Sequence, residues 1–120
     1  AALEWMVKND TYPMDNEWRI KQRYVLILFF FSTKGLNWYD RLNFLSSVDE
    51  CIWRETGIRA FSQNKNFKGI LCNEEGKVTE MMFSWNNLSG TIPHEIGNLN
   101  GTLTNIDLMG GSLSSTIPET

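Results

Sequence analysis

Long hydrophobic runs are absent from this 120-residue sequence. The longest unbroken apolar stretch covers eight residues, Tyr24–Phe31, whereas a membrane-spanning helix needs roughly twenty. The chain begins with Ala1 rather than Met, and it opens without the basic and then apolar segment of a secretory signal peptide. We therefore expect no membrane span within these residues, and we expect that processing or truncation has already removed a preceding segment.

Groups that carry out catalysis or bind metals are scarce. His94 is the only histidine, and no serine, cysteine or carboxylate pair is placed with it in the manner of a catalytic triad. The acidic pairs Asp49-Glu50 and Glu74-Glu75 are interpreted as solvated surface charges, with calcium ligation as a remote alternative. The sequence therefore predicts a protein that is not an enzyme and that holds no metal ion and no cofactor.

Basic residues are missing from the last third of the chain. Residues 1–77 hold eleven basic and ten acidic residues, a net charge of +1. Residues 78–120 hold four acidic residues and no Lys or Arg, a net charge of −4. The total of −3 argues against nucleic acid as a partner, because neutralising phosphates needs a basic surface. The change after residue 77 predicts two differently built parts.

Apolar residues recur at helical spacing over residues 17–32. The second half of this segment, EWRIKQRYVLILFFFS, is apolar on every side, which predicts a helix that is buried on several faces. Gly35 is placed to terminate that helix. A weaker pattern predicts a short earlier helix over Leu3–Lys8.

Tryptophan and phenylalanine are frequent for a chain of this length. Large rings supply much apolar area per residue, so Trp18, Trp38 and Trp53 are interpreted as core residues. An aromatic platform for carbohydrate is the alternative, and nothing near these residues in the sequence supports it.

Cysteine occurs only at positions 51 and 72. A pair 21 residues apart without a nearby histidine matches neither a zinc site nor a Cys-x-x-Cys redox site. A disulfide between Cys51 and Cys72 is favoured if the compartment is oxidising, and closing a loop of this size would add about 3 kcal/mol of stability. Two buried free thiols in a reducing compartment remain the alternative.

The last third of the chain contains an internal repeat. NLSGTIP at residues 87–93 and SLSSTIP at residues 112–118 are identical at five of seven positions, with an offset of 25 residues. The match extends upstream, so residues 78–93 and 103–118 both follow the pattern LxxLxLxxNxLxGxIP, the second copy with losses. Such a period is typical of a solenoid in which each unit contributes one strand and one return segment.

The repeat pattern assigns a direction to its side chains. Met81, Phe83 and Leu88 are expected to point into the coil. Asn86 is expected to hydrogen-bond backbone groups that the turn leaves unpaired, and Gly90 is expected to help bend the chain back. The outward positions of the two strands then form one surface, which we call the strand face: Glu80, Met82, Ser84, Trp85, Asn105, Asp107 and Met109.

The strand face is the candidate ligand-binding surface. In a parallel sheet, the 25-residue offset predicts the outward rows Glu80–Asn105, Met82–Asp107 and Ser84–Met109. An exposed Trp85 would favour binding, because tryptophan often carries much of the binding energy at interfaces. The alternative is a row of solvated strand positions that never contact a ligand.

The order of these motifs resembles that of plant-type extracellular leucine-rich-repeat proteins, beginning with their helical N-terminal cap. The segments that carry the resemblance are Gly35-Leu-Asn-Trp38, Cys51-Ile-Trp53, Gly69-Ile-Leu-Cys72 and the lead-in to the first strand, residues 73–80. The segment YVLILFFFSTKG is similar to the cap helix of diatom and algal leucine-rich-repeat receptor-like proteins.

Three features depart from that family. Residues 54–68 separate two cysteines that usually lie only a few residues apart. Gly111 replaces the turn asparagine of the repeat and Ser115 replaces its glycine, so we expect a looser second coil. The repeat is also one residue longer than is usual.

The resemblance implies an α+β fold, in which a helical cap with a Cys51–Cys72 disulfide at residues 1–77 precedes one complete and one truncated leucine-rich repeat at residues 78–120. It implies a non-catalytic recognition module of a receptor-like protein, outside the cell or at its surface, that binds a protein, peptide or glycan on the strand face. Any membrane anchor would lie outside this chain. The sequons at Asn9, Asn87 and Asn100 are candidate glycosylation sites.

Two alternatives stay open. A second coil without a cap would expose Leu108, Leu113 and Ile117, so the chain would be a truncated structural fragment that self-associates and has no activity of its own. Some plant relatives of this architecture inhibit enzymes, so an inhibitor of a secreted hydrolase is the other alternative.

Overall fold

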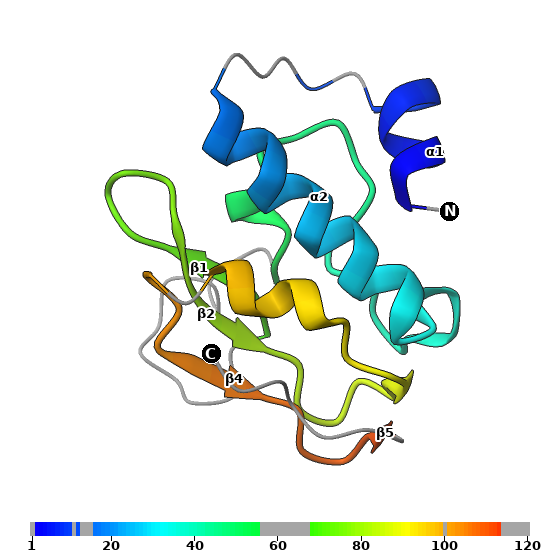
Figure 1. Cartoon of the computed structure of the whole chain (residues 1–120). Helices are drawn as coiled ribbons and strands as arrows, with labels where there is room; N and C mark the ends of the chain where they lie inside the picture. The colour runs from blue at the N-terminus through cyan, green and yellow to red at the C-terminus, as the bar shows by residue number, and fades with distance from the viewer. Residues whose placement is uncertain (1, 11, 13–15, 56–67, 100, 114–120) are drawn as a thin grey trace.

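The protein consists of helices packed against short β-strands. A computed structural model describes residues 2–10, 12, 16–55, 68–99 and 101–113. The helices are α1 (Ala2–Lys8), α2 (Glu17–Ser32) and the short 3-10 helices η1 (Gly35–Asn37), η2 (Glu50–Ile52) and η4 (His94–Leu99) (Figure 1). The strands are β1 (Gly69–Cys72), β2 (Val78–Met82), β3 (Ser89–Gly90), β4 (Asn105–Asp107) and β5 (Ser112–Leu113). The α+β class is confirmed.

Helix α2 has the bounds that its apolar periodicity predicts. Its second half is buried on several faces, as expected, through Val25, Leu26, Ile27, Phe29 and Phe30. Helix α1 also forms and begins one residue earlier than predicted. No helix in the described part of the chain is long and apolar enough to cross a membrane.

Gly35 does not end helix α2 by adopting the left-handed conformation. Lys34 takes that conformation instead, with φ of 60°, and Gly35 begins η1. A glycine is needed at position 35 for space, because a Cβ atom there would lie 2.2 Å from the ring of Phe30. The close approach of η1 to the helix therefore explains this glycine.

Strand β2 lies at the centre of a three-stranded sheet. It pairs antiparallel with β1 and parallel with β4. Glu80 lies opposite Asn105 and Met82 opposite Asp107, which is the 25-residue offset that the repeat predicts. The inward row of Ile70, Met81 and Ile106 packs toward α2 and the core.

Strands β3 and β5 form a second, two-stranded parallel sheet whose register differs from the repeat. Ser89 lies opposite Ser112 and Gly90 opposite Leu113, an offset of 23 residues rather than 25. The shift follows Gly110 and Gly111, where the second copy has no counterpart of the Asn86 side chain. The looser second coil itself stays a prediction.

Aromatic rings from both parts of the chain form one cluster. Neighbouring ring centroids lie 4.9–6.0 Å apart among Phe29, Phe30, Trp38, Phe44, Trp53 and Phe83. Trp38 and Trp53 are core residues, as predicted, but the prediction was wrong for Trp18, which is 37% exposed. The Trp18 ring instead lies beside the side chains of Arg19 and Lys77.

A buried ion network joins α2 to the start of η2 and to Asp10, which follows α1. Both Arg23 and Glu50 are fully buried, and Arg23 Nη1 lies 3.3 Å from Glu50 Oε1. Arg23 also binds the Asp10 carboxylate through two nitrogens, at 2.7 and 2.9 Å. Its guanidinium lies 4.5 Å from the ring centroid of Trp53. Glu50 is therefore not the solvated surface charge that the sequence suggested.

The same network contains Arg19, at the first turn of α2. Arg19 pairs with Asp49 and, at 3.2 Å, with Glu50. Burial lowers the pKa of the Arg19 guanidinium, but the carboxylates of Glu50 and Asp49 outweigh burial and raise it above its ordinary value. Burial, followed by the nearby Asp49 carboxylate, raises the pKa of Tyr12. Asp49 thus belongs to an ion network as well.

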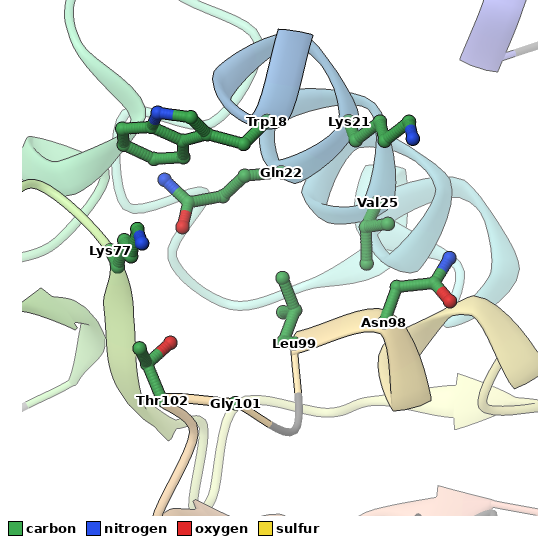
Figure 2. A pocket seen from close by; sticks show the side chains of 9 residues that line it. All are labelled: Trp18, Lys21, Gln22, Val25, Lys77, Asn98, Leu99, Gly101 and Thr102. Atoms are coloured by element: carbon green, nitrogen blue, oxygen red, sulfur yellow. The ribbon is translucent and has the colours of Figure 1, made fainter.

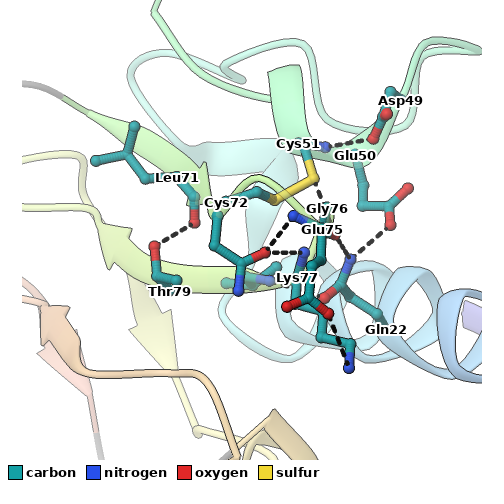
Figure 3. The surroundings of a disulfide bond; sticks show 12 residues. Gln22, Asp49, Glu50, Cys51, Leu71, Cys72, Glu75, Gly76, Lys77 and Thr79 are labelled. Carbon is teal, nitrogen blue, oxygen red and sulfur yellow. Dashed lines mark hydrogen bonds and ion pairs between the residues drawn. A yellow bond between two sulfur atoms is a disulfide. The ribbon is translucent and has the colours of Figure 1, made fainter.

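The predicted disulfide between Cys51 and Cys72 is confirmed and joins η2 to the end of β1, with Cα atoms 5.6 Å apart. Figure 3 shows Gln22 beside it, reaching from α2. The Gln22 amide donates to Glu50 and to the carbonyl of Gly76, and its oxygen accepts from the Val78 N–H at 2.8 Å. One buried side chain therefore links α2, the disulfide region and the start of β2.

Candidate functional site

The structure brings the predicted rows of the strand face together. The pairing of β2 with β4 places Glu80 beside Asn105 and Met82 beside Asp107. The third row also forms, because the Trp85 N–H donates to the Met109 carbonyl at 2.7 Å and so continues the parallel ladder. The seven predicted positions therefore belong to one continuous surface.

Strand β1 extends the strand face on the other edge of β2. Leu71 lies opposite Glu80 and Gly69 opposite Met82, so both share the outward rows. Leu71 is half-buried and adds an apolar side chain beside the carboxylate of Glu80. These positions were not predicted, because Gly69–Cys72 was interpreted only as part of the disulfide motif. The short apolar run that contains Ile70 and Leu71 was the available signal for a strand.

Trp85 and Met109 are the most exposed apolar residues of the strand face. Their side chains are 64% and 62% exposed. The Trp85 backbone has φ of 56°, and its ring lies against the backbone of Gly110, where a Cβ atom would be 2.3 Å from a ring carbon. The ring is thus held from one side by Gly110 and open to solvent over most of its surface.

Polar groups of the strand face are held by short local contacts. Asp107 Oδ1 accepts from the Met109 N–H at 3.1 Å, and Asn105 Nδ2 lies 3.7 Å from the sulfur of Met82. Glu80 takes part in none of the ion pairs found among the described residues, and neither does Asp107. The face therefore offers carboxylate and amide groups around an exposed indole.

Asn86 holds the strand face against the cap. Its Oδ1 accepts from the Asp40 N–H, and its Nδ2 donates to the Asp40 carbonyl, both at 2.8 Å. The predicted backbone hydrogen bonds of this asparagine thus form, but with the segment after η1 rather than within the turn. The inward direction of Met81, Phe83 and Leu88 is confirmed, since each is at most 1% exposed.

Gly90 allows the end of α2 to approach β3. Its φ is +86°, and a Cβ atom at this position would lie 2.4 Å from the carbonyl oxygen of Ser32. Two backbone hydrogen bonds run across the same contact, from Ser89 to Thr33 and from Thr91 to Ser32. The helical cap therefore docks directly on the first turn of the repeat.

The described residues contain one group of three potential metal ligands, Asp49, Glu50 and Cys51. Cys51 is in the disulfide, and both carboxylates pair with Arg19. Both carboxylates of this group are thus already engaged by the Arg19 guanidinium. His94 is exposed at the start of η4.

Two of the three sequon asparagines lie in the described part of the chain. Asn9 and Asn87 are exposed, and Asn87 Nδ2 donates to the carbonyl of Asn37 at 2.9 Å. Asn100 lies outside the described residues. Exposure makes Asn9 and Asn87 accessible to modification, which stays a prediction.

The edge that was expected to drive self-association is partly described. In the described residues, β4 is an edge strand of its sheet. Leu108 and Leu113 are half-buried and pack against the core, while Ile117 lies outside the described residues. The two leucines are therefore less exposed than an uncapped coil was expected to leave them.

Comparison with family models, with curated proteins and with solved structures finds no match to this chain. Two features of the molecule bear on its function: a helical region that contains the Cys51–Cys72 disulfide, and an exposed strand face built by parallel pairing at a 25-residue offset.

Proposed function

We propose that this chain is the N-terminal part of an extracellular leucine-rich-repeat protein and acts as a non-catalytic recognition module. On this proposal residues 1–77 form the cap and residues 78–120 form the first repeats. The single observation that carries it is the parallel register of β2 and β4, in which Glu80 lies opposite Asn105 and Met82 opposite Asp107. Parallel strands that recur at the period of the sequence repeat are what a solenoid requires.

The cap supports the same proposal. A solenoid needs its first coil covered, because an open end exposes the apolar interior. Here α2 and the aromatic cluster cover the inward side of β2 through Phe29 and Phe83, whose centroids are 5.0 Å apart. The Cys51–Cys72 disulfide is compatible with a secreted or cell-surface location.

The strand face suggests what kind of ligand would bind. Glu80 and Asp107 offer carboxylates, Asn105 offers an amide, and Trp85 offers a flat apolar surface. A protein, peptide or glycan that presents hydrogen-bond donors beside an apolar patch complements this combination. We expect the exposed ring of Trp85 to contribute most of the affinity.

Assembly through the edge of β4 is a second candidate function. A strand edge in the described residues offers unpaired backbone groups for another strand, either from a further repeat or from another copy. Sedimentation analysis over a range of protein concentrations tests it. A concentration-dependent dimer that Ile106→Pro abolishes would support assembly, whereas a monomer at every concentration would contradict it.

Ligand binding is tested with the secreted, disulfide-bonded chain. We would probe immobilised glycans and a random peptide library, and then measure the affinity of each hit for variants of the strand face. Trp85→Ala is expected to weaken binding by about tenfold or more, whereas Trp18→Ala, which removes an exposed tryptophan outside the strand face, should leave it unchanged. Asp107→Asn should weaken binding less.

The proposal fails if no hit depends on Trp85 or Asp107. It also fails if Trp18→Ala weakens every hit as much as Trp85→Ala does, because binding would then not be located on the strand face. Circular dichroism of each variant establishes that the fold is retained before affinities are compared.

A further inference from the structure

A pocket of about 300 Å³ lies between α2, the end of η4 and the segment before β2. It shares no lining residue with the strand face. Figure 2 shows Val25 and Leu99 facing each other across it, and both are nearly fully buried. The ring of Trp18 forms a wall at one end. The interior surface is therefore mainly apolar, and its volume lies at the lower end of the range for small-molecule sites.

One side of helix α2 supplies four of the lining residues, at positions 18, 21, 22 and 25. This spacing places them on one helical face. The polar groups of Gln22 are already hydrogen-bonded, because its amide donates to Glu50 and Gly76 and its oxygen accepts from Val78. Gln22 therefore forms a fixed wall of the pocket, and the neighbouring side chains would have to contact a ligand.

Two lysines are among the lining residues of the pocket. Lys77 lies beside Trp18, with its Nζ 5.3 Å from the ring centroid, whereas Lys21 lies on α2 at the opposite end of the pocket (Figure 2). Each ammonium has an acidic neighbour, Glu17 at 3.4 Å from Lys21 and Glu75 at 3.9 Å from Lys77.

Both acidic neighbours are weak competitors for a ligand. The side chains of Glu17 and Glu75 are 86% and 75% exposed, and exposed ion pairs contribute little to stability. A bound carboxylate can replace either neighbour at small cost. Thr102 Oγ1 donates its proton to the Val78 carbonyl at 2.8 Å and so offers no donor to the anion, whereas the amide of Asn98 adds a donor at the rim.

We propose that this pocket binds a small organic anion, in which a carboxylate is attached to an apolar ring or chain. The apolar body lies against Val25, Leu99 and the ring of Trp18, and the carboxylate faces Lys77 at the rim. Lys21 adds a second positive charge at the opposite end of the pocket. Charge complementarity selects the carboxylate over a neutral or cationic analogue, because a neutral ligand gains the apolar contacts alone. This site is independent of ligand binding on the strand face.

The test uses the disulfide-bonded chain, 3-phenylpropionate as the probe and amide chemical shifts as the readout. We expect saturable shifts at Val25, Leu99, Thr102 and the Trp18 indole N–H. The neutral analogue 3-phenylpropanamide is expected to bind the wild-type protein about twofold to fivefold more weakly than the anion does. The anion is expected to bind Lys21→Gln or Lys77→Gln more weakly than the wild-type protein by the same factor. The amine 3-phenylpropylamine should bind more weakly than either.

Lys8→Gln is a matched control for Lys21→Gln. Both lysines are exposed on a helix and pair with a glutamate four residues earlier, at 3.3 Å for Lys8 and 3.4 Å for Lys21. Lys8→Gln should leave the affinity unchanged. Trp18→Ala should weaken binding of the anion, and Trp85→Ala should not, so this pocket and the strand face are distinguished by opposite responses.

The proposal is overturned by any of three results. The first is that the carboxylate and the amide bind equally well. The second is that the shifts occur away from the pocket or that Lys8→Gln weakens binding as much as Lys21→Gln. The third is that no saturable shift is seen up to about 10 mM anion, ten times the dissociation constant of a millimolar fragment.

Discussion

Residues 2–77 and residues 78–113 are held in place by different interactions. The first part contains the disulfide, two buried arginine-linked ion pairs and most of the aromatic cluster. The second part has no Lys or Arg, and its strands are two to five residues long. Strands this short have little stability by themselves. The second part therefore takes its structure from contact with the first.

The two parts are joined by hydrogen bonds to backbone groups as well as by the shared aromatic cluster. Gln22 accepts from the Val78 N–H, Asn86 pairs with the Asp40 backbone, and β3 bonds to the end of α2. Backbone bonds fix position and direction together. The cap thus sets the register from which the parallel strands start.

The largest expected effect comes from removing the charge at the centre of the cap. Arg23→Met leaves the buried carboxylate of Asp10 without its ion-pair partner and leaves Glu50 with Arg19 and Gln22 alone. Breaking a buried pair typically costs about 3–5 kcal/mol. Urea unfolding monitored by circular dichroism measures the loss. Lys21→Met, on the exposed face of the same helix, should change stability by about 0.5 kcal/mol or less. Similar midpoints for the two variants would contradict the central role of Arg23.

Opening the disulfide is expected to be the next largest loss. Cys51→Ser together with Cys72→Ser should lower the free energy of unfolding by about 2–5 kcal/mol, because the unfolded chain is no longer constrained. Thermal unfolding under oxidising conditions measures this. Reducing the wild-type protein should give the same melting temperature as the double variant. An unchanged melting temperature in the double variant would contradict the prediction.

Local periodicity was sufficient to predict the framework of both parts. The bounds of α2, the cysteine pairing and the 25-residue register of β2 and β4 each depend on spacing within one or two segments. The burial of Glu50 was not predictable in that way. Its partners, Arg19 and Arg23, lie 31 and 27 residues away, and nothing in the local sequence distinguishes their charges from solvated ones.

The strand face was predictable in its rows but not in its full width. The repeat relates β2 to β4, and no repeat relates β1 to β2, so Leu71 was missed. Trp18 shows the opposite limitation. Its size favours burial, yet its place in the first turn of α2 leaves it at the rim of a pocket. Which apolar side chain stays exposed depends on where the neighbouring element ends.

The junction between the parts is expected to show an intermediate effect. Asn86→Ala removes both hydrogen bonds that the buried Asn86 side chain makes to the Asp40 backbone, which should cost about 1–3 kcal/mol. Asn105→Ala, an exposed amide on β4, should cost less than about 0.5 kcal/mol. Amide hydrogen exchange measures where stability is lost: relative to the wild-type protein, Asn86→Ala should speed exchange more in β4 than in α2. Uniform destabilisation of both parts would contradict a junction that holds the strands to the cap.

The smallest expected effect concerns Trp85, where two substitutions distinguish the contribution of the side chain to stability from that of the backbone conformation. Because the ring is 64% exposed, Trp85→Ala should change stability by about 0.5 kcal/mol or less. The backbone at this position has φ of 56°, and its counterpart in the second repeat is Gly110 with φ of +83°. Trp85→Gly should therefore be more stable than Trp85→Ala by about 1 kcal/mol, since glycine adopts positive φ without steric cost.

Urea unfolding of the two variants at position 85 distinguishes a surface ring from a structural one. If Trp85→Ala alone lost several kcal/mol, the indole would belong to the core and the strand face would lose its main binding residue. If alanine and glycine were equally stable, the left-handed turn would not be held in the folded protein. We expect the glycine variant to be more stable than the alanine variant, with both close to the wild-type protein in stability. That result requires that the fold holds residue 85 at positive φ and that the ring is not buried. That combination leaves the indole available to a ligand.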